Sequence, residues 1–596
     1  MIFADRIKIL EILKQLKFVT DADENIAEFL CGLERNLSKD EKQTLAIVSA
    51  LIFEWVSSGS ICLTKNDIET FIKTNKDALS GIAFPNWKEI ENVMAKSSCC
   101  TQNPENENKP LVFADGKIYF YKYWLYENSL AERVLEISKN KGKYAEKADA
   151  IKAVLEKLFD EDAKKYGSRN IEQQKAAETV IKHRFSVITG GPGTGKTTTV
   201  AKIIAGILSV CPKETIILAA PTGKAAARMS EALSNETKKI EEADVIENAD
   251  ILERIKSIEG ETIHRLLDWK FGKPEKNRQN PITADLVIVD EASMVDIAMF
   301  SALLDALSEE TSLILLGDKD QLASVDVGNV LADICTSREL LPDGTVSELK
   351  TSHRFEDHPA IGRLASAVNG QKKASEIMDI CKEHDLGFQE IKPETAKKEM
   401  GNIVSDAKEK YKFLSDKSLD PKEILQKLNN FKILCPSKED FFGVDNINRQ
   451  IAEAFGKQPD TVYNGRPVMI TKNDYTNNLM NGDCGVILER NRETKAYFLQ
   501  GENIASFDIS GLTAFETVYA MTIHKSQGSE YISVHIILPE REMPMLTKEL
   551  LYTAITRAKE KVEITAKESV FEYSLKNSAA RNSGFKEALE KAWKAL

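Results

Sequence analysis

The chain has 596 residues, of which 42% are hydrophobic and 29% are charged, and its formal net charge is −12. At about 150 residues per domain, this length predicts roughly four structural units. The most apolar runs, 286–289 and 313–316, are far shorter than the ~20 residues of a membrane span, and residues 1–6 do not resemble a secretion signal. We therefore expect a globular cytoplasmic protein without a membrane partner.

The cysteines and the net charge further limit the functional classes to which the protein can belong. The nine cysteines form no C-x-x-C pair, so neither a zinc knuckle nor an iron–sulfur cluster has its ligand spacing, and free thiols fit a reducing compartment. The acidic balance is weak evidence against nucleic acid, because a DNA-binding groove depends on its local lining. Since no basic tail is present, we expect modest DNA affinity or help from partner subunits.

Residues 1–150 are dominated by helical periodicity. Apolar residues recur every three or four positions between Ile7 and Leu16, and again between Leu45 and Ile52. A short strand-like run at 117–124 interrupts this pattern. The region carries no polar cluster that suggests chemistry, so we predict a helical docking or scaffold domain.

From about residue 168 the pattern becomes that of an α/β fold. Short apolar and β-branched runs alternate with amphipathic helices, which is typical of parallel sheets covered on both faces. The predicted strands are 185–189, 215–219, 286–290, 313–317, 433–436 and 534–538. Between 457 and 515, glycine and proline positions followed by Tyr497-Phe498-Leu499 instead predict a small antiparallel barrel or sheet, inserted into the second α/β unit.

A glycine-rich loop between a strand and a helix carries the strongest chemical signal. Strand 186–189 runs directly into the loop and an amphipathic helix follows, which is the context that a phosphate-binding loop requires. The glycines let backbone N–H groups surround phosphate oxygens, and the helix N-terminus adds the positive end of its dipole. We predict that Lys196 binds the β- and γ-phosphates and that Thr197 helps to bind Mg²⁺. The predicted nucleotide-binding residues here are Gly190, Gly191, Pro192, Gly193, Thr194, Gly195, Lys196, Thr197 and Thr198.

Two further strands end in polar residues that suit hydrolysis. Strand 286–289 is followed by Asp290, placed to bind Mg²⁺, and by Glu291, placed to activate the attacking water. Two acids at a strand end can also form a surface turn, but the phosphate-binding loop upstream favours catalysis. Strand 313–316 precedes Gln321, which is placed to detect the γ-phosphate. ATP and Mg²⁺ are therefore the predicted cofactors.

In this order the motifs resemble those of superfamily 1 helicases and, within them, the RecD-type 5′-to-3′ branch. The matching segments are 190–197, 219–228, 262–267, 290–293, 317–328, 352–355, 522–528 and 552–558, and they cover about residues 165–565. The resemblance implies an α/β protein with two RecA-like P-loop motor domains, a helical N-terminal domain and an inserted SH3-like β barrel.

The resemblance also implies roles outside the phosphate-binding loop. It implies that Gln173 contacts the adenine base, the alternative being an exposed residue at a helix start. Arg354 and Arg557 are implied to reach the γ-phosphate from the second motor domain, so that hydrolysis depends on closure of the cleft. Glu530 is implied to touch the ribose. The expected catalytic residues are then Lys196, Glu291, Gln321, Arg354 and Arg557.

A DNA track across both motor domains is a further implication of the resemblance. Small hydroxyl residues and backbone amides suit a motor that grips phosphates without reading sequence. The expected contacts are Pro221, Thr222, Thr262, His264, Thr522, His524 and Ser526. For His264 and His524, packing in the core or stabilisation of a loop is an equally good explanation as contact with DNA. The aromatic and basic loop that begins at Trp269 is a candidate for strand separation, with an ordinary exposed loop as the alternative.

The resemblance divides the chain as follows. We expect a helical docking domain at 1–150, a first motor domain at 165–345 with a small 1B-like loop at about 268–283, a second motor domain formed by 346–456 and 516–596, and an inserted SH3-like 2B domain at 457–515.

The favoured function is that of a RecD-type subunit of a RecBCD-type exodeoxyribonuclease V, an ATP-dependent 5′-to-3′ DNA helicase that processes double-strand DNA ends for recombinational repair. Its implied partners are RecB-like and RecC-like subunits in a heterotrimer, with single-stranded DNA in the motor track and a duplex end ahead of it. Nothing in the chain resembles a nuclease site. Two alternatives stay open: a stand-alone RecD-like helicase, which usually carries a longer N-terminal region with helix-hairpin-helix elements, and a subunit that binds ATP without moving.

Overall fold

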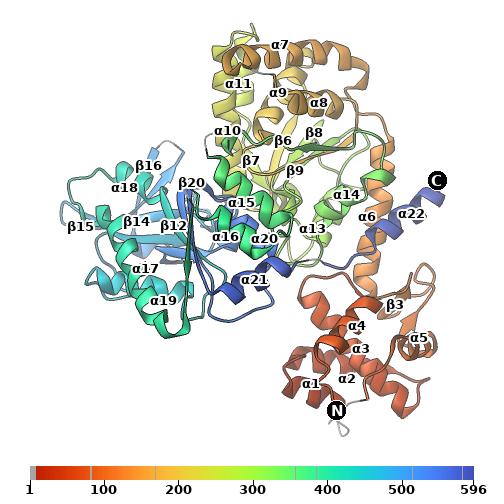
Figure 1. Ribbon diagram of the computed structural model, residues 1–596. Coiled ribbons are helices and arrows are strands. Elements are labelled where there is room, and N and C mark those ends of the chain that lie inside the picture. Colours follow the sequence, from red (N-terminus) through yellow and green to blue (C-terminus); the bar gives the residue numbers. More distant parts are fainter. Residues whose placement is uncertain are drawn as a thin grey trace.

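The computed structural model describes residues 8–595 apart from 81–82, 168, 356–357, 384–385, 475, 502, 513 and 580. Four sheets organise these residues, two of them parallel. The N-terminal part and the first parallel sheet are joined by one long helix, while the second parallel sheet and the antiparallel insert lie to one side (Figure 1). The predicted α/β class with parallel sheets is confirmed.

The N-terminal part contains helices and a small sheet. Its helices are α1 (Lys8–Gln15), α2 (Asp21–Leu33), α3 (Lys39–Ser57), α4 (Lys65–Thr74) and α5 (Trp87–Lys96). Four of them, α2 to α5, begin with a capping box in which a polar N-cap and an acidic third residue bond each other's backbone. The sheet has the order β1 (Cys62–Thr64), β4 (Lys117–Phe120), β3 (Leu111–Ala114) and β2 (Cys100–Thr101). The predicted helices are therefore accompanied by a four-stranded sheet, of which the sequence indicated only the run at 117–124, because strands of two to four residues are too short to show a period.

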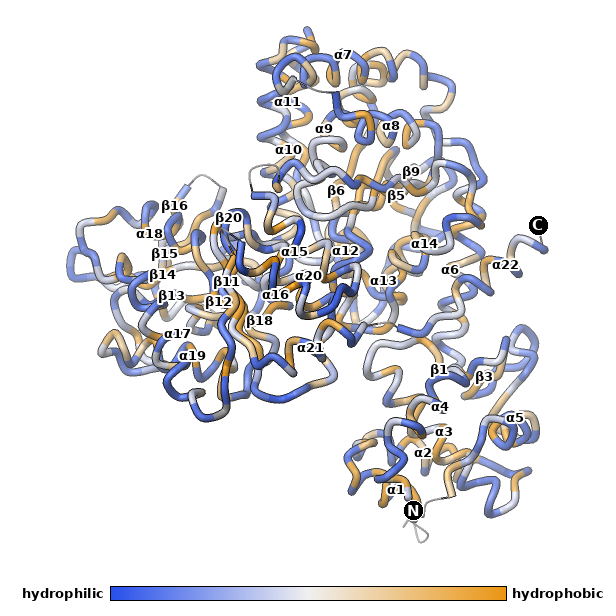
Figure 2. Tube along the Cα trace, viewed as in Figure 1, coloured by the Kyte–Doolittle hydropathy of each residue, from blue (hydrophilic) through white to orange (hydrophobic). Residues whose placement is uncertain are grey.

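The first parallel sheet has its strands in the order β10 (Val346–Leu349), β5 (Phe185–Gly190), β9 (Ser312–Gly317), β8 (Leu286–Val289), β6 (Ile216–Ala220) and β7 (Gly260–Thr262). One face packs against α7 (Ala148–Tyr166), α8 (Ile171–Val180), α9 (Lys196–Val210), α10 (Gly223–Glu242) and α11 (Ala249–Lys256). The other packs against α6 (Tyr121–Lys139), α13 (Ile297–Asp305) and α14 (Val330–Thr336). The short helix α12 (Ile263–Leu266) follows β7. Because both faces are buried, the central strands are apolar throughout (Figure 2).

The second parallel sheet has the order β11 (Leu386–Glu390), β20 (Ala558–Ala566), β19 (Tyr531–Ile537), β12 (Phe431–Cys435) and β18 (Ala520–Thr522). Its covering helices on one face are α15 (Pro359–Asn369), α16 (Ala374–Ile380), α20 (Lys548–Ile555) and α21 (Glu568–Lys576). Those on the other face are α17 (Ala396–Lys410), α18 (Pro421–Leu428) and α19 (Val444–Ala454). The predicted strands 433–436 and 534–538 thus lie side by side at the centre of this sheet.

The insert is an antiparallel sheet with its own small apolar core. Its strands run in the order β16 (Asn503–Asp508), β15 (Glu493–Gln500), β14 (Cys484–Arg490), β13 (Arg466–Ile470) and β17 (Phe515–Thr517). A Cβ on Gly485 would lie 2.5 Å from the Phe498 ring of the neighbouring strand, so only glycine lets the two strands approach. The predicted antiparallel character of this segment is confirmed.

Three domain boundaries expected from the sequence differ from the boundaries that the structure shows. Strand β10, placed in the second motor domain from sequence, pairs with β5 and completes the first sheet. Strand β17 pairs with β13, so the insert continues to Thr517. The C-terminal helix α22 (Phe585–Ala595) leaves the second sheet and packs against α6 and α14 (Figure 1). Each limit was misplaced because pairing partners far along the chain leave no local pattern.

A buried carboxyl ties α6 to the segment that leads into α22. Glu127 accepts hydrogen bonds from the Ser583 hydroxyl at 2.9 Å and from the Gly584 amide at 2.8 Å. Burial is the main cause that raises the pKa of Glu127, to about 7, although these donors and Lys117 act in the opposite direction. The folded state therefore keeps a proton that the unfolded state releases near pH 4.5.

Replacing this carboxyl should change how stability depends on pH. Because the pKa of Glu127 is raised on folding, its contribution is fully present below pH 4.5 and is lost as the pH rises through 7, by about 3 kcal/mol. Glu127→Gln keeps the accepting oxygen and removes the titration. We expect a larger gain in melting temperature at pH 8 than at pH 5, measured by thermal unfolding. The exposed Glu132→Gln on the same helix should show equal effects at both pH values; the same result for Glu127→Gln would contradict the prediction.

Candidate ATP site and DNA track

The phosphate-binding loop lies between the buried strand β5 and the N-terminus of α9. Gly193 and Gly195 have φ of +77° and +81°, which favour glycine. A Cβ on Gly195 would lie 2.0 Å from Nε2 of Gln173, so a side chain there would also collide. The Lys196 ammonium donates to the carbonyls of Gly190 and Gly191. The glycines predicted from the sequence therefore lie where the backbone requires them, and they allow a ligand to approach the backbone closely.

Two carboxylates follow β8 at the same edge of the sheet. The Glu291 amide donates to Oδ1 of Asp290 at 2.8 Å, and Glu291 has φ of +51°. A glutamate in this region is strained, and such strain collects at functional sites, where the surroundings hold it. Burial, and then the neighbouring Glu291, raises the pKa of Asp290 to about 6, while Lys196 opposes the shift. A cation beside Asp290 would relieve the cost of this buried charge.

These residues line one pocket of about 270 Å³ together with residues from the second sheet. The predicted residues that line it are Pro192, Gly193, Thr194, Gly195, Lys196, Thr197, Thr198, Asp290, Glu291, Gln321, Arg354, Glu530 and Arg557. Gln321 donates through Nε2 to Asp318, which also accepts from the Tyr552 hydroxyl at 3.0 Å. Tyr552 belongs to α20 of the second sheet. The strand end that carries Gln321 is therefore bonded directly across the cleft.

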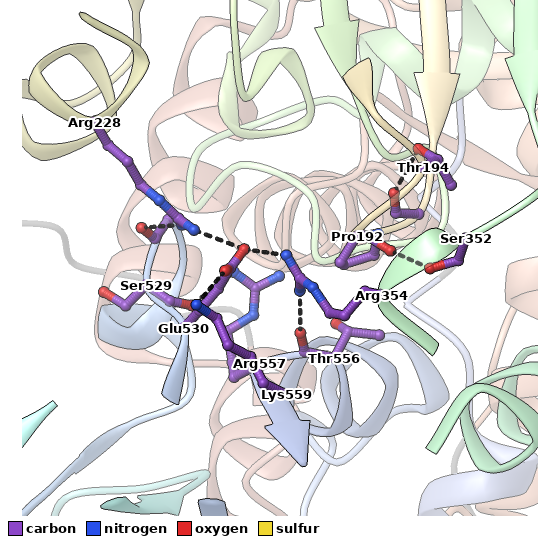
Figure 3. Close-up of polar contacts among 12 residues, drawn as sticks. Pro192, Thr194, Arg228, Ser352, Arg354, Ser529, Glu530, Thr556, Arg557 and Lys559 are labelled. Atoms are coloured by element: carbon purple, nitrogen blue, oxygen red, sulfur yellow. Dashed lines mark hydrogen bonds and ion pairs between the residues drawn. The ribbon is translucent and has the colours of Figure 1, made fainter. Parts of the chain in front are cut away.

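Glu530 gathers positive charges in this pocket (Figure 3). It forms ion pairs with Arg354 and with Arg228, the latter at 2.6 Å, and Lys559 lies 3.5 Å away. Burial would raise the pKa of Glu530, but Arg228 and Arg354 outweigh it and hold the pKa at about 2. The Arg557 guanidinium is buried and donates to backbone carbonyls, among them that of Ser529 at 3.3 Å.

Arg228 is a pocket residue that the sequence interpretation did not include among its site residues. It lies on α10, and its guanidinium donates to the Gly528 carbonyl at 2.6 Å besides pairing with Glu530. Its position in the matching segment 219–228 was visible, but an arginine in the middle of a helix carries no local sign of its partners. Only the approach of the two sheets shows its place.

Gln173 lies beside a second cavity of about 900 Å³ that continues from the phosphate-binding loop. Its side chain is 5% exposed, and Nε2 donates to the Thr194 carbonyl at 3.0 Å. The alternative of an exposed helix-start residue is therefore wrong. The side-chain oxygen of Gln173 is an acceptor suited to an exocyclic amino group such as that of adenine, and contact with the base stays a prediction.

Each segment expected to contact DNA contains a threonine hydroxyl that accepts a hydrogen bond from the turn that follows it; Thr222 and Thr262 are also the N-caps of α10 and α12. The hydroxyls of Thr222, Thr262 and Thr522 each accept from a backbone amide three residues ahead, at 3.2 to 3.3 Å. Pro221 directly precedes the first of these turns. Helix N-termini favour phosphate groups, so the turns suit phosphate contact through the remaining backbone amides.

Three other expected DNA contacts have distinct surroundings. His264 is exposed, and its ring lies 5.4 Å from that of Trp269 in an edge-to-face arrangement. His524 is partly buried, and burial lowers its pKa. Ser526 is fully buried, with its hydroxyl donating to the Ile523 carbonyl at 2.7 Å. The Ser526 hydroxyl is therefore already used within the 3₁₀ turn, and a contact of this residue with DNA stays a prediction.

The candidate strand-separating loop forms a tight turn. Phe271 and Gly272 at its tip have φ of +50° and +80°, and Lys270 and Lys273 pair across it. The Phe271 side chain is fully exposed. The geometry is that of a hairpin turn, and its role stays a prediction.

Known protein families match both halves of this architecture. The model described as AAA domain matches residues 173–327, and the one described as UvrD-like helicase C-terminal domain matches residues 517–565. The chain is 33% identical to the RecBCD enzyme subunit RecD of Mycolicibacterium smegmatis, over 96% of this chain and 97% of that protein. The chain belongs to the RecD family. The RecBCD enzyme subunit RecD of Haemophilus influenzae is also similar to this RecD-family chain, at 30% identity over 98% of this chain and 99% of that protein.

A more distant relative is the ATP-dependent RecD2 DNA helicase of Deinococcus radiodurans. It is 28% identical over 70% of this RecD-family chain, but the match covers only 52% of that protein. Among solved structures, Bacteroides Pif1 bound to ssDNA has a TM-score of 0.38 and 17% identity over 66% of this chain and 91% of that one. The similarity to the RecD subunits of Mycolicibacterium smegmatis and Haemophilus influenzae, over nearly the whole chain, confirms the family resemblance inferred from the sequence motifs.

Within the described part of this RecD-family chain, no helix is both long and apolar enough to cross a lipid bilayer.

Proposed function

We propose that this RecD-family chain is the ATP-driven 5′-to-3′ DNA helicase subunit of a RecBCD enzyme and acts on double-strand DNA ends. The observation that carries the proposal is the composition of one pocket. Lys196, Asp290 and Glu291 enter it from the first sheet, while Arg354 and Arg557 enter it from segments that lead into or belong to the second. A nucleotide held there touches both motor domains, so its hydrolysis changes how they sit together.

The pocket residues divide the work of hydrolysis between them. Lys196 neutralises the β- and γ-phosphates, and Glu291 orients and deprotonates the attacking water. Arg354 and Arg557 stabilise the charge that develops on the transferred phosphoryl group, and Gln321 senses its departure through the bonds that join its strand end to α20. In addition, we assign Gln173 to the base and Glu530 to the ribose.

The donor set also fits Mg²⁺ beside the nucleotide. Carboxylate and hydroxyl oxygens are ligands that this hard cation prefers, and Asp290 with Thr197 supplies one of each in the pocket. The raised pKa of Asp290 reflects a buried charge that a cation would stabilise. When bound beside Asp290 and Thr197, the ion would supply positive charge that offsets the negative charge of the phosphates.

We also assign a role to each part of the chain outside the ATP pocket. The N-terminal part serves as a docking domain for RecB-like and RecC-like subunits, and the antiparallel insert is an SH3-like 2B domain that borders the DNA. We place the single strand along the turns at Thr222, Thr262 and Thr522, with the duplex end at the loop 268–283. Duplex cleavage belongs to a partner subunit.

The stand-alone helicase is the second candidate. The RecD2 helicase is matched over half of its length, whereas the RecD subunits are matched over nearly all of theirs. This difference favours the subunit. Copurification of the tagged chain with two larger partner chains is the result we expect, whereas a monomer that unwinds DNA efficiently by itself would favour the alternative.

The polarity of unwinding tests the motor directly. We expect the assembled complex to unwind a duplex with a 5′ single-stranded tail through this chain, because its motifs resemble those of the 5′-to-3′ branch of superfamily 1 helicases. The measurement compares 5′-tailed and 3′-tailed duplexes of equal sequence, using wild type and a complex with Lys196→Gln. Loss of unwinding on the 5′ tail alone in that variant supports the proposal. If the Lys196→Gln complex lost unwinding only on the 3′-tailed duplex, this chain would move 3′ to 5′, which contradicts the proposal.

A further inference from the structure

Three side chains of the kinds that bind metal ions meet on the second sheet, on the face covered by α17. His535 on β19 and Glu563 on β20 are direct neighbours in the strand pairing, and Asp406 lies on α17. One ring nitrogen of the histidine and one carboxylate oxygen of each acid lie within 4.8 Å of one another. We call Asp406, His535 and Glu563 the His–carboxylate cluster. It shares no residue with the ATP pocket described above.

The histidine of this cluster has a buried ring nitrogen that the protein leaves unbonded. His535 is 6% exposed, and its Nε2 lies 2.8 Å from the Thr565 hydroxyl. Nδ1 is also buried, and no residue that the structure describes forms a hydrogen bond with it. A histidine that binds a metal ion is typically oriented in this way, with its second ring nitrogen bonded to a neighbouring polar group. Thr565 therefore fixes the ring, and Nδ1 is the nitrogen left for a ligand.

The protonation states of the cluster suit a metal ion. Burial lowers the pKa of His535 to about 4, so the ring is the neutral imidazole that metal ions bind. Burial would raise the pKa of Glu563, but Lys561 and Lys410 outweigh it and hold the pKa at about 2. The cluster thus offers one neutral nitrogen and charged carboxylate oxygens near neutral pH.

The two carboxylates already hold a cation between them. The Lys410 ammonium lies 2.8 Å from Asp406 and 3.0 Å from Glu563. Lys410 is the last residue of α17 and is only partly buried, so its flexible stem can carry the ammonium into solvent. A metal ion that enters the cluster takes the place of this ammonium, and the two cations compete for the same carboxylates.

The donor set favours Zn²⁺ over Mg²⁺. Zn²⁺ binds imidazole nitrogen and carboxylate oxygen at about 2.0–2.2 Å, whereas Mg²⁺ prefers oxygen ligands. In a tetrahedron these bonds place the donor atoms roughly 3.4 Å apart. The donors of the cluster now lie within 4.8 Å, so a small approach is needed. Rotation of the exposed Asp406 side chain supplies it, because this residue projects from the helix surface.

We propose that Asp406, His535 and Glu563 form a Zn²⁺ site that fastens α17 to the second motor sheet, with Lys410 as an internal competitor for the same position. Three protein ligands leave one tetrahedral position for water. The ion joins one helix to two strands, so it stabilises the folded domain by binding to it. This inference goes beyond the proposed function, since it involves neither the ATP pocket nor the DNA track.

Calorimetric titration of the full chain with Zn²⁺ alone tests the site, after metal has been removed with a chelator and the chelator washed out. We expect saturable binding that Asp406→Asn weakens at least about tenfold, because a charged ligand is lost. Lys410→Met should instead tighten binding about tenfold, because it removes the competing cation. Glu409→Gln, an exposed change on the same helix, is the matched control and should bind as wild type.

Thermal unfolding of the same proteins gives a second measurement. Zn²⁺ should raise the melting temperature of wild type and more so that of Lys410→Met, and it should have a smaller effect on Asp406→Asn and His535→Gln. Asp406 is exposed, so its replacement tests the site even if the change at buried His535 prevents folding. Equal Zn²⁺ affinity in wild type and Asp406→Asn would place the ion on other groups, such as thiols, and overturn the inference. Failure of Lys410→Met to bind Zn²⁺ would overturn it as well.

Discussion

Lys196→Gln should reduce DNA-stimulated ATP hydrolysis by about 100-fold or more, because the loop then lacks the ammonium that neutralises the phosphates. The glutamine is one bond shorter than the lysine but keeps an N–H donor that faces the carbonyls of Gly190 and Gly191, which now accept from the lysine. The loop should therefore keep its shape. The measurement is steady-state hydrolysis over a range of ATP concentrations in the presence of oligo(dT).

Lys213→Gln is the matched control for this change. Lys213 is exposed on the turn after α9, so its replacement removes the same charge from the same domain without touching the pocket. We expect activity within a factor of about two of wild type for a surface change of this kind. Retention of full activity by Lys196→Gln, with the control unchanged, would remove the basis for a nucleotide-driven motor.

Glu291→Gln should have the second large effect, and on a different kinetic parameter. Removing a general base costs about 10²- to 10⁴-fold in kcat, while the amide leaves the size of the residue and its backbone turn unchanged. Lys196 and the glycine loop still hold the phosphates, so binding of an ATP analogue should persist. The measurement pairs single-turnover hydrolysis with analogue binding, and exposed Glu310→Gln in the same domain serves as control.

The two variants together distinguish binding from chemistry. Lys196→Gln should weaken nucleotide binding as well as turnover, whereas Glu291→Gln should spare binding. If Glu291→Gln weakened binding as much as turnover, its carboxylate would be holding the pocket together and another residue would activate the water. The backbone of residue 291 is strained, with φ of +51°. Glutamate and glutamine must both adopt this same backbone conformation, so a difference between them reports on the carboxylate and not on the turn.

Local patterns predicted the central elements because short-range physics decides them. Burial on both faces requires continuous apolar strands, and the predicted strands at 185–189, 286–290 and 313–317 all lie in the first sheet. The glycines of the phosphate-binding loop are likewise required by positive φ and close approach at their own positions. The antiparallel insert was predicted from its glycine and proline positions and from the run Tyr497-Phe498-Leu499.

Long-range pairing had no such local sign. Strand β10 joins the first sheet by pairing with β5, some 160 residues earlier, and the C-terminal helix returns to α6 across most of the chain. Of the N-terminal sheet, only β4 coincides with a predicted strand-like run, and the other strands are too short for a period to appear. The sequence likewise did not show that the Ser526 hydroxyl is used within its own turn.

The sequence by itself predicted the chemistry of this RecD-family chain: a loop for phosphates, two carboxylates for hydrolysis and arginines able to stabilise the transferred phosphoryl group. These depend on residue type and on neighbours a few positions away. Only the tertiary structure decided that Arg228, Arg354 and Arg557 converge on residues 528–530. Arg228 reaches these residues only because the two motor domains meet at the ATP pocket. That meeting depends on many contacts between residues far apart in the chain, which no single motif reveals.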